Sequence, residues 1–168
     1  RGTAYHRVME CLDYTKVDEP DQIRRQLRQM TDEKKLTYKE AESVRVKDIW
    51  TFVESPLGQR MKNAFQNGSL KREQPFVIAR RAEELDPKWQ ADESILVQGI
   101  MDAWFMEGED IVLADYKTDY VKPDQENMLA EKYRGQLEDY AGALERMTGR
   151  KVKERYIYSF CLGKEILL

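Results

Sequence analysis

The sequence predicts a mixed α/β domain in which a helix, three strands, a second helix and a fourth strand follow one another, with extra helices inserted after the first. Apolar residues recur at helical spacing through residues 3–14 and 20–66, and again through 127–147. Apolar runs or alternation typical of strands cover residues 71–85, 94–118 and 152–162. With 168 residues, 41% of them apolar and 35% charged, the chain can form one compact domain with a core.

Composition and charge argue against several classes of protein. A net charge of −3 argues against a protein that coats nucleic acid by charge alone, although it does not exclude a nuclease. The two cysteines, Cys11 and Cys161, suggest neither a metal-binding pair nor a disulfide framework, which favours a reducing, cytoplasmic setting. Neither a membrane-spanning apolar run nor a leader is visible. Because the chain opens Arg-Gly-Thr-Ala without methionine, we expect a domain of a longer polypeptide.

The first expected helix covers residues 3–14, with Thr3 as its cap. His6, the only histidine in the chain, lies one helical turn before Glu10, so both side chains project from one side of this helix. A single histidine near a helix start is more often a structural or surface residue than a ligand. We keep His6 as a candidate because neutral imidazole is a common metal ligand.

Residues 20–66 are expected to form several helices separated by residues that favour helix ends. Thr37, followed three residues later by Glu40, matches a capping box, and Ser43 is expected to begin the next helix. The arginines and lysines of this region are interspersed with acids, so solvated helix faces are favoured over a phosphate-binding lining. The remaining start and stop signals are Pro20, Ser55-Pro56 and Asn67-Gly68.

A strand over residues 71–85 and a polar loop over 86–93 come next. Glu73 precedes the apolar part of this strand. It is either a further acid near a metal or an exposed residue at the start of the strand, and the second interpretation is favoured because lone acids usually face solvent.

Residues 94–118 predict two strands joined by a tight turn at residues 107–110, because Gly108 suits the first central position of a type II′ turn. Counting back from this turn places Asp102 directly opposite Asp115. Opposed residues have Cβ atoms about 4.5–5.5 Å apart, and like charges there destabilise a sheet. A bound divalent cation would offset this repulsion, since carboxylate oxygens are ligands that Mg²⁺, Mn²⁺ and Ca²⁺ prefer.

Lys117 lies one pleat from Asp115 on the same face of the predicted strand, so two carboxylates and an amine should converge on one surface. The alternative is an ordinary solvated ion pair of Asp102 and Lys117 beside Asp115 on an exposed sheet face.

Residues 119–125 form a predicted loop, and a long helix is expected over 127–147 before the glycine of Thr148-Gly149-Arg150 ends it. Gln136 and Tyr140 are i, i+4 partners on this helix. Residues 152–162 alternate in the way of a final strand.

Four blocks of sequence stand out: GTAYHRVME at residues 2–10, GIMD at 99–102, ADYKT at 114–118 and YRGQLEDYA at 133–141. In this order they resemble the RecB-type nuclease domains of the PD-(D/E)XK superfamily, most of all the carboxyl-terminal nuclease domains of AddA-type helicase–nucleases. Methionine rather than proline precedes Asp102, which is ordinary in this branch. The resemblance covers residues 1–168 as a single nuclease domain. It implies a restriction-endonuclease-like αβββαβ core, in agreement with the order of elements above.

The resemblance also implies roles for individual residues. His6, Asp102, Asp115 and the backbone carbonyl of Tyr116 would hold Mg²⁺, with Mn²⁺ as a substitute. Asp102 and Asp115 would act in catalysis together with Lys117, the catalytic lysine, which positions a water molecule or offsets developing charge.

Gln136 and Tyr140 match the Gln-x-x-x-Tyr motif of the RecB-type branch, which implies that they support the site and contact DNA. The alternative for Tyr140 is an ordinary core residue.

The implied activity is metal-dependent hydrolysis of DNA by an exonuclease module that processes double-strand breaks for recombinational repair in the bacterial cytoplasm. The implied partners are single-stranded DNA threaded from a helicase motor, the rest of the parent helicase chain and an AddB-type subunit. The sequence lacks a Gly-x-x-x-x-Gly-Lys-Ser/Thr loop, so ATP would bind in the motor, and it lacks the cysteines of an iron–sulfur cluster. The alternatives are another RecB-type nuclease, from a phage or a CRISPR system, and a non-catalytic DNA-binding relative. The retained Asp102, Asp115 and Lys117 argue against the last.

Overall fold

The computed structural model of the chain describes residues 2–81 and 94–168. The strands within them are β1 (Lys71–Arg81), β2 (Ser94–Glu107), β3 (Asp110–Lys117), β4 (Val152–Ser159) and β5 (Lys164–Leu167). They form one sheet in the order β1-β2-β3-β4-β5, in which β3 and β4 are parallel and the other neighbours are antiparallel. The end of the strand predicted at 71–85 and the loop predicted at 86–93 lie outside the described residues.

The helices before the sheet are α1 (Gly2–Cys11), α2 (Pro20–Asp32), α3 (Tyr38–Ser43), α4 (Val46–Glu54) and α5 (Pro56–Gln66). The capping box of Thr37 and the helix start at Ser55-Pro56 are confirmed, with Ser55 capping α5. The expected cap at Thr3 is wrong, because α1 already begins one residue earlier. The expected helix start at Ser43 is also wrong. Its hydroxyl donates to the Glu40 carbonyl inside α3, and Arg45 takes the cap position of α4.

After β3 the chain passes through a short 3-10 helix, η1 (Pro123–Gln125), into the long helix α7 (Glu126–Thr148). This helix was predicted to within one residue at each end, and Gly149 stops it with φ 68 in the left-handed region. The strand predicted at 152–162 was too long. It ends at Ser159, whose carbonyl accepts from the Gly163 N–H at 2.8 Å, and the reversed chain forms the short strand β5.

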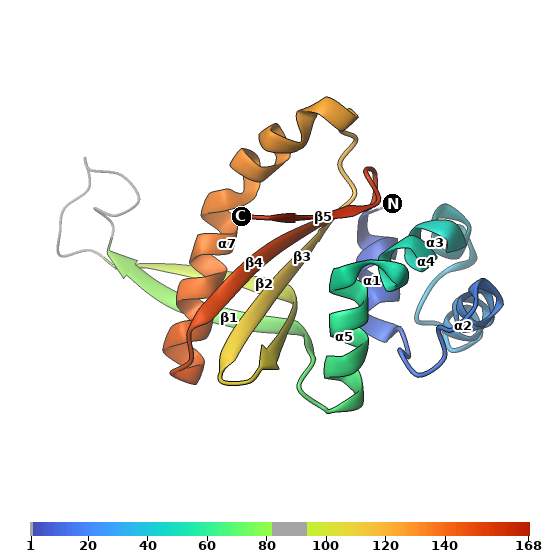
Figure 1. Cartoon of the computed structure of the whole chain (residues 1–168), viewed down its shortest axis with the longest axis horizontal. Helices are drawn as coiled ribbons and strands as arrows, with labels where there is room; N and C mark the ends of the chain where they lie inside the picture. Colours follow the sequence, from blue (N-terminus) through green and yellow to red (C-terminus); the bar gives the residue numbers. More distant parts are fainter. Residues whose placement is uncertain (1, 82–93) are drawn as a thin grey trace.

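Two apolar cores hold the layers together, with α1 to α5 on one face of the sheet and α7 on the other (Figure 1). Along β3, Val112 and Ala114 are buried under the first group of helices, whereas Ile111 and Leu113 are buried under α7. Side chains alternate along a strand, so Asp115 falls on the α7 side. The acids of the predicted site are therefore within reach of side chains from α7.

The junction between α4 and α5 depends on the absence of a side chain at Gly58. A Cβ atom there would lie 1.9 Å from the carbonyl oxygen of Phe52. The Gly58 N–H donates to the Ser55 hydroxyl that caps α5, at 3.1 Å. This close approach lets the chain turn sharply, so that Phe52 and Leu57 are both buried in the core against the sheet.

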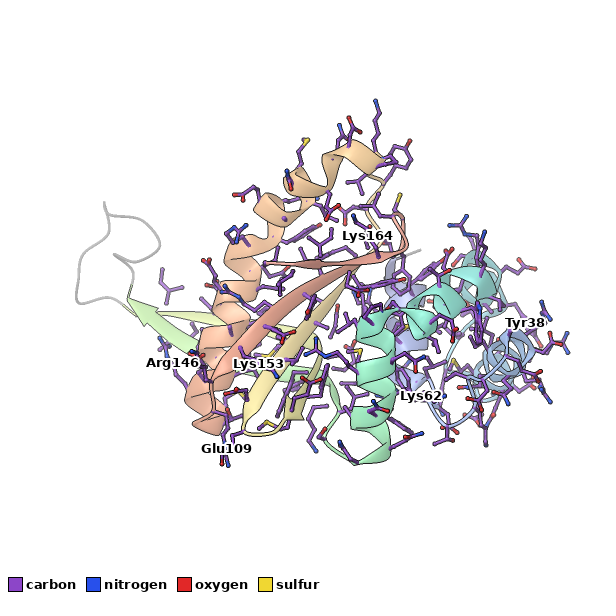
Figure 2. The ribbon with its side chains drawn as sticks, in the orientation of Figure 1. Tyr38, Lys62, Glu109, Arg146, Lys153 and Lys164 are labelled. Carbon is purple, nitrogen blue, oxygen red and sulfur yellow. The ribbon has the colours of Figure 1, made fainter. Side chains whose placement is uncertain are left out.

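Charged side chains cover the outside of the molecule (Figure 2). Glu109 lies at the β2–β3 turn, and Tyr38 lies on α3 at the opposite end of the molecule from the β2–β3 turn. Among residues 2–81 and 94–168, no helix combines the length and the apolar character needed to cross a membrane.

Candidate active site

The two acids predicted to face each other lie where β2 and β3 leave their shared ladder. The ladder ends at the pair Ala103 and Ala114, in the register predicted from the turn. Asp102 and Asp115 come next in this register, but they do not form a ladder pair. The Tyr116 N–H instead donates to Oδ2 of Asp102 at 2.7 Å. Asp102 and Asp115 therefore lie together as predicted, and the Asp102 carboxylate takes the place of a backbone carbonyl as the acceptor of the Tyr116 N–H.

His6 reaches the same place from α1. Its Nε2 lies 3.1 Å from Oδ2 of Asp102, and its Nδ1 lies 2.9 Å from the carbonyl oxygen of Gly2. The hydrogen bond to Asp102 raises the pKa of His6 to about 9, against the opposing effect of burial. Glu10, one turn away, pairs with Arg7 instead. The structure therefore places His6 at Asp102, whereas Glu10 on the same helix is not paired with either of them.

Asp115 is only 3% exposed, and Asp102 is 8% exposed. Oδ2 of Asp115 lies 2.6 Å from Nζ of Lys117, a contact that is an ion pair and not an aligned hydrogen bond. Burial, and next the charge of Asp102, raise the pKa of Asp115 to about 6, although Lys117 lowers it. The alternative of a solvated ion pair on an exposed face is therefore wrong for these acids.

Contacts from α7 hold Lys117 in place. Its Nζ donates to Oε1 of Gln136 at 3.0 Å and lies 4.0 Å from the centre of the Tyr133 ring. Nε2 of Gln136 in turn donates to the hydroxyl of Tyr140 at 2.8 Å, and the Tyr140 ring packs on Phe76 with centroids 5.2 Å apart. Tyr140 is thus a core residue that also orients the amide beside the lysine. Direct DNA contact by Gln136 or Tyr140 stays a prediction.

Glu73 lies near this site and is half-buried, although the sequence favoured an exposed strand start. The ladder pairs on either side of it leave Glu73 facing Asp102 across β1 and β2. Its φ of 49 lies in the left-handed region, where a residue with a side chain is strained. Burial, and next the charge of Asp102, raise the pKa of this half-buried carboxyl. Only the register of β1 against β2 could have indicated this position.

The donor atoms of the site suit a hard divalent cation, because carboxylate oxygen and imidazole nitrogen are ligands of Mg²⁺ and Mn²⁺. In the described part of the chain, no three His, Cys, Asp or Glu side chains converge in the arrangement of a metal centre. Instead, His6 is paired with Asp102, and Lys117 with Asp115. A cation would offset the charge of the two acids, since burial and next the charge of Asp102 raise the pKa of Asp115. The Tyr116 carbonyl, next along the backbone, would be a further donor.

The stability of the metal-free chain should fall as the pH rises from about 6.5 through about 9. The pKa of His6 is 6.5 ordinarily and about 9 in the fold, so the folded chain keeps a proton that the unfolded chain releases across this window. A cation needs neutral imidazole, so its affinity should rise about tenfold per pH unit over the same range. Because the chain has one histidine, a single imidazole signal in an NMR titration in EDTA reports the pKa.

A titration midpoint near 6.5 would contradict this expectation. As a control, His6→Gln should remove the fall in melting temperature between these pH values while leaving the fold intact.

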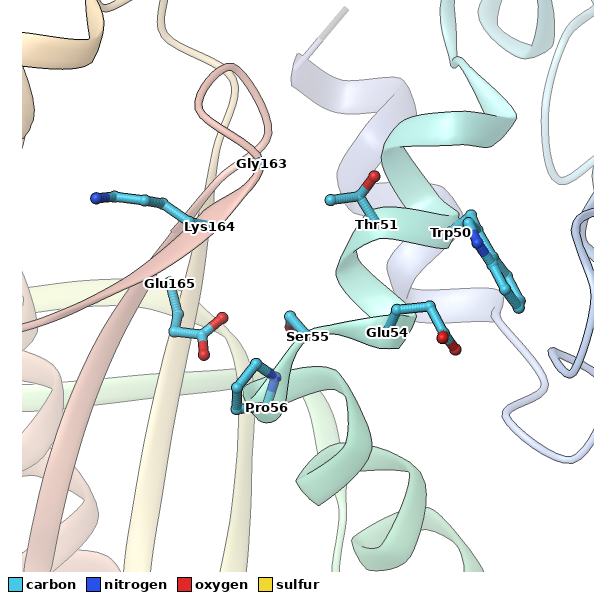
Figure 3. Close-up of a pocket in the computed structure, with 8 residues that line it drawn as sticks. All are labelled: Trp50, Thr51, Glu54, Ser55, Pro56, Gly163, Lys164 and Glu165. Atoms are coloured by element: carbon cyan, nitrogen blue, oxygen red, sulfur yellow. The ribbon is translucent and has the colours of Figure 1, made fainter.

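A separate hollow of about 520 Å³ lies between the α4–α5 junction and β5 (Figure 3). Glu165 and Pro56 are among the residues that line it, and the Glu165 carboxylate points toward Pro56. Lys164 points away, and it pairs with Glu126 of α7. This hollow is lined by none of the residues predicted for the site, so that chemistry is not located there.

Comparison with known proteins identifies the family. The sequence model of the PD-(D/E)XK nuclease superfamily matches residues 1–164 of this chain. The A subunit of an ATP-dependent helicase/nuclease from Syntrophomonas wolfei is 41% identical over 166 residues, which are 99% of this chain and 13% of that protein. Proteins of the same name from Clostridium perfringens and Clostridium acetobutylicum are 41% and 42% identical, over 99% of this chain and 14% of theirs.

The chain therefore spans only about one seventh of the length of these relatives. The family match nevertheless extends over nearly all of this chain, from α1 with its histidine to the start of β5. The fold and the four predicted blocks fall within the matched residues. This chain belongs to the PD-(D/E)XK nuclease superfamily and is a nuclease domain related to part of these large helicase/nuclease proteins.

Proposed function

We propose that this chain is a metal-dependent deoxyribonuclease that hydrolyses the phosphodiester bonds of single-stranded DNA. The observation that supports this most strongly is the pair of nearly buried acids, Asp102 and Asp115, with Nζ of Lys117 2.6 Å from Asp115. Two carboxylates and an amine held out of water at one point are costly for a fold to maintain, and such groups cluster at functional sites.

The residues that would hold Mg²⁺, or Mn²⁺ in its place, are His6, Asp102, Asp115 and the backbone carbonyl of Tyr116. When bound, such an ion supplies Lewis-acid polarisation of a phosphate oxygen and lowers the pKa of water. His6 would take part as neutral imidazole, so it must first lose the proton that Asp102 stabilises.

Lys117 would act on the reacting phosphate. Its ammonium group, aligned by Gln136, would position the attacking water or offset the charge that develops on the phosphate oxygens. Because the amine already lies in place before substrate arrives, little reorganisation is needed during the reaction. Gln136 and Tyr140 would act through this lysine as positioning residues.

We further propose that the chain works as the exonuclease domain of a larger helicase–nuclease. This is supported by the names of its relatives and by the small share of them that it covers. A motor in the rest of the parent chain would then supply one DNA strand, and an AddB-type subunit would be the partner. The proposed use is the processing of double-strand-break ends for recombinational repair.

Incubation of the chain with end-labelled single-stranded DNA tests the nuclease proposal. We expect cleavage with Mg²⁺ or Mn²⁺ and complete loss of cleavage in EDTA, because the acids cannot act on phosphate without a cation between them. An Asp115→Ala chain, purified in the same way, controls for contaminating nucleases. DNA that is degraded equally in EDTA, or that stays intact with both metals, would reject the proposal.

A further inference from the structure

A cavity of about 290 Å³ lies at the end of β3, on the side of the sheet where Tyr5 of α1 packs against Phe160. Thr118, which directly follows Lys117, forms part of its wall. The amino terminus of α1 and the β4–β5 turn lie next to each other at this end of the molecule (Figure 1). The residues that line the cavity are Tyr5, Arg45, Thr118, Tyr120, Phe160 and Cys161.

Two side chains of this wall can recognise a nucleotide. Tyr120 is 84% exposed, which is unusual for so large a ring in a folded chain. The side chain of Arg45 is 62% exposed, and its Nε donates to Asp48 at 2.9 Å. That contact orients the guanidinium group, which carries five N–H donors in a planar fork.

The floor of the cavity is rigid. The rings of Tyr5 and Phe160 pack with centroids 4.7 Å apart, and both residues are buried. The Tyr5 hydroxyl also accepts the backbone N–H of Arg45 at 3.2 Å, which ties the arginine to α1. The cavity is therefore shaped before any ligand enters it, and less entropy is lost on binding.

Gly2 connects this cavity with the imidazole of the site. Its carbonyl lies 2.9 Å from Nδ1 of His6. A Cβ atom at Gly2 would also lie 3.2 Å from Oγ1 of Thr118, so the first turn of α1 packs closely on the cavity wall. The first turn of α1 thus lies between the imidazole of the site and the cavity wall at Thr118, so a strand bound at the site would place a neighbouring nucleotide at the cavity.

We propose that this cavity binds the nucleotide of single-stranded DNA next to the bond that is cut, with its base stacked on Tyr120 and its phosphate paired with Arg45. The inference rests on the proposed nuclease function. Every base has a flat face, so such stacking accepts any sequence, as a nuclease that digests a moving strand requires. Arginine offers a planar fork of donors that matches phosphate. The cavity has the size of a small-ligand site and not that of a duplex groove.

Binding of a short fluorescent single-stranded oligonucleotide, followed by anisotropy in EDTA, tests this subsite separately from cleavage. We expect Tyr120→Ala to weaken binding about tenfold through the loss of one stacked base, and Tyr120→Phe to keep the wild-type affinity. Tyr38→Ala is the matched control, because Tyr38 is 77% exposed on α3 (Figure 2) and does not line the cavity. Arg45→Ala should reduce the slope of log affinity against log salt by about 0.7, the value for one phosphate contact on a single strand.

A scan with a single abasic nucleotide locates the stacked base. The wild-type chain should lose affinity at one position of the oligonucleotide, and Tyr120→Ala should lose nothing further there. The subsite is wrong if Tyr120→Ala binds as Tyr38→Ala does, or if its abasic profile equals that of the wild type. Cleavage of the same oligonucleotide with Mg²⁺ is measured in parallel. Cleavage without any effect at Tyr120 rejects the subsite alone, whereas a wild-type chain that never cleaves rejects the nuclease proposal and the subsite with it.

Discussion

Replacing Lys117 with alanine should slow metal-dependent DNA cleavage by about 10²- to 10³-fold, the usual effect of removing one group that stabilises charge in a transition state. The amine lies 2.6 Å from Asp115 and 3.0 Å from Gln136, so it is fixed where phosphate charge would develop. It is not itself a metal ligand in the proposed site. Binding of Mn²⁺ should therefore persist, and single-turnover cleavage with saturating Mn²⁺ is the measurement to make.

A thermal shift separates the lysine from the acids. At Mn²⁺ concentrations about 100-fold above the dissociation constant, a bound ion should stabilise the fold by about 2.7 kcal/mol in both the wild type and Lys117→Ala. Asp115→Ala should lose this stabilisation together with cleavage. Lys132→Ala is a matched control, since Lys132 lies over the same Tyr133 ring at 4.8 Å but pairs with Asp119. Equal cleavage by the wild type, Lys117→Ala and Asp115→Ala would remove the basis of the assignment.

Gly58→Ala should destabilise the metal-free chain by about 3 kcal/mol or more, the largest effect on stability that we expect from a single methyl group. The added carbon would lie 1.9 Å from the Phe52 carbonyl oxygen, and backbone atoms cannot move aside as a flexible side chain does. The α4–α5 junction must then open, which exposes apolar residues packed on the sheet. Chemical denaturation in EDTA measures the free energy of unfolding.

Gly142→Ala provides the opposite control for this experiment. A Cβ atom at Gly142 would meet nothing within 4 Å. This glycine lies inside α7, where alanine should stabilise the helix by about 0.5–1 kcal/mol. If both substitutions change the stability in the same direction, the close contact at Gly58 does not control the junction.

Much of the site could be predicted because local rules determine it. A glycine turn sets the register of β2 and β3, and that register alone brings Asp102 toward Asp115. The contact between Gln136 and Tyr140 could also be predicted, because residues four apart meet on one face of any helix, whatever the rest of the fold. Signals of this kind span a few residues, and tertiary contacts do not override them.

The remaining features depend on contacts between distant segments. Glu73 faces Asp102 only because β1 pairs with β2 in one register, and a glutamate gives no local sign of a positive φ. The sequence indicates an ordinary inward-facing position for Tyr133 on α7, yet its ring covers the amine of Lys117. Strand β5 is too short to stand out in the sequence, because alternation over four residues is common by chance.

The residues of the site lie on elements that are synthesised at different times. The imidazole leaves the ribosome first with α1, the acids follow with β2 and β3, and the amide that aligns the amine comes last with α7. A nascent chain that has stalled before α7 thus carries the acids without the support for the lysine. We expect such a truncated product to cut nucleic acid more slowly than the complete domain, because the α7 side chain that aligns Lys117 is missing.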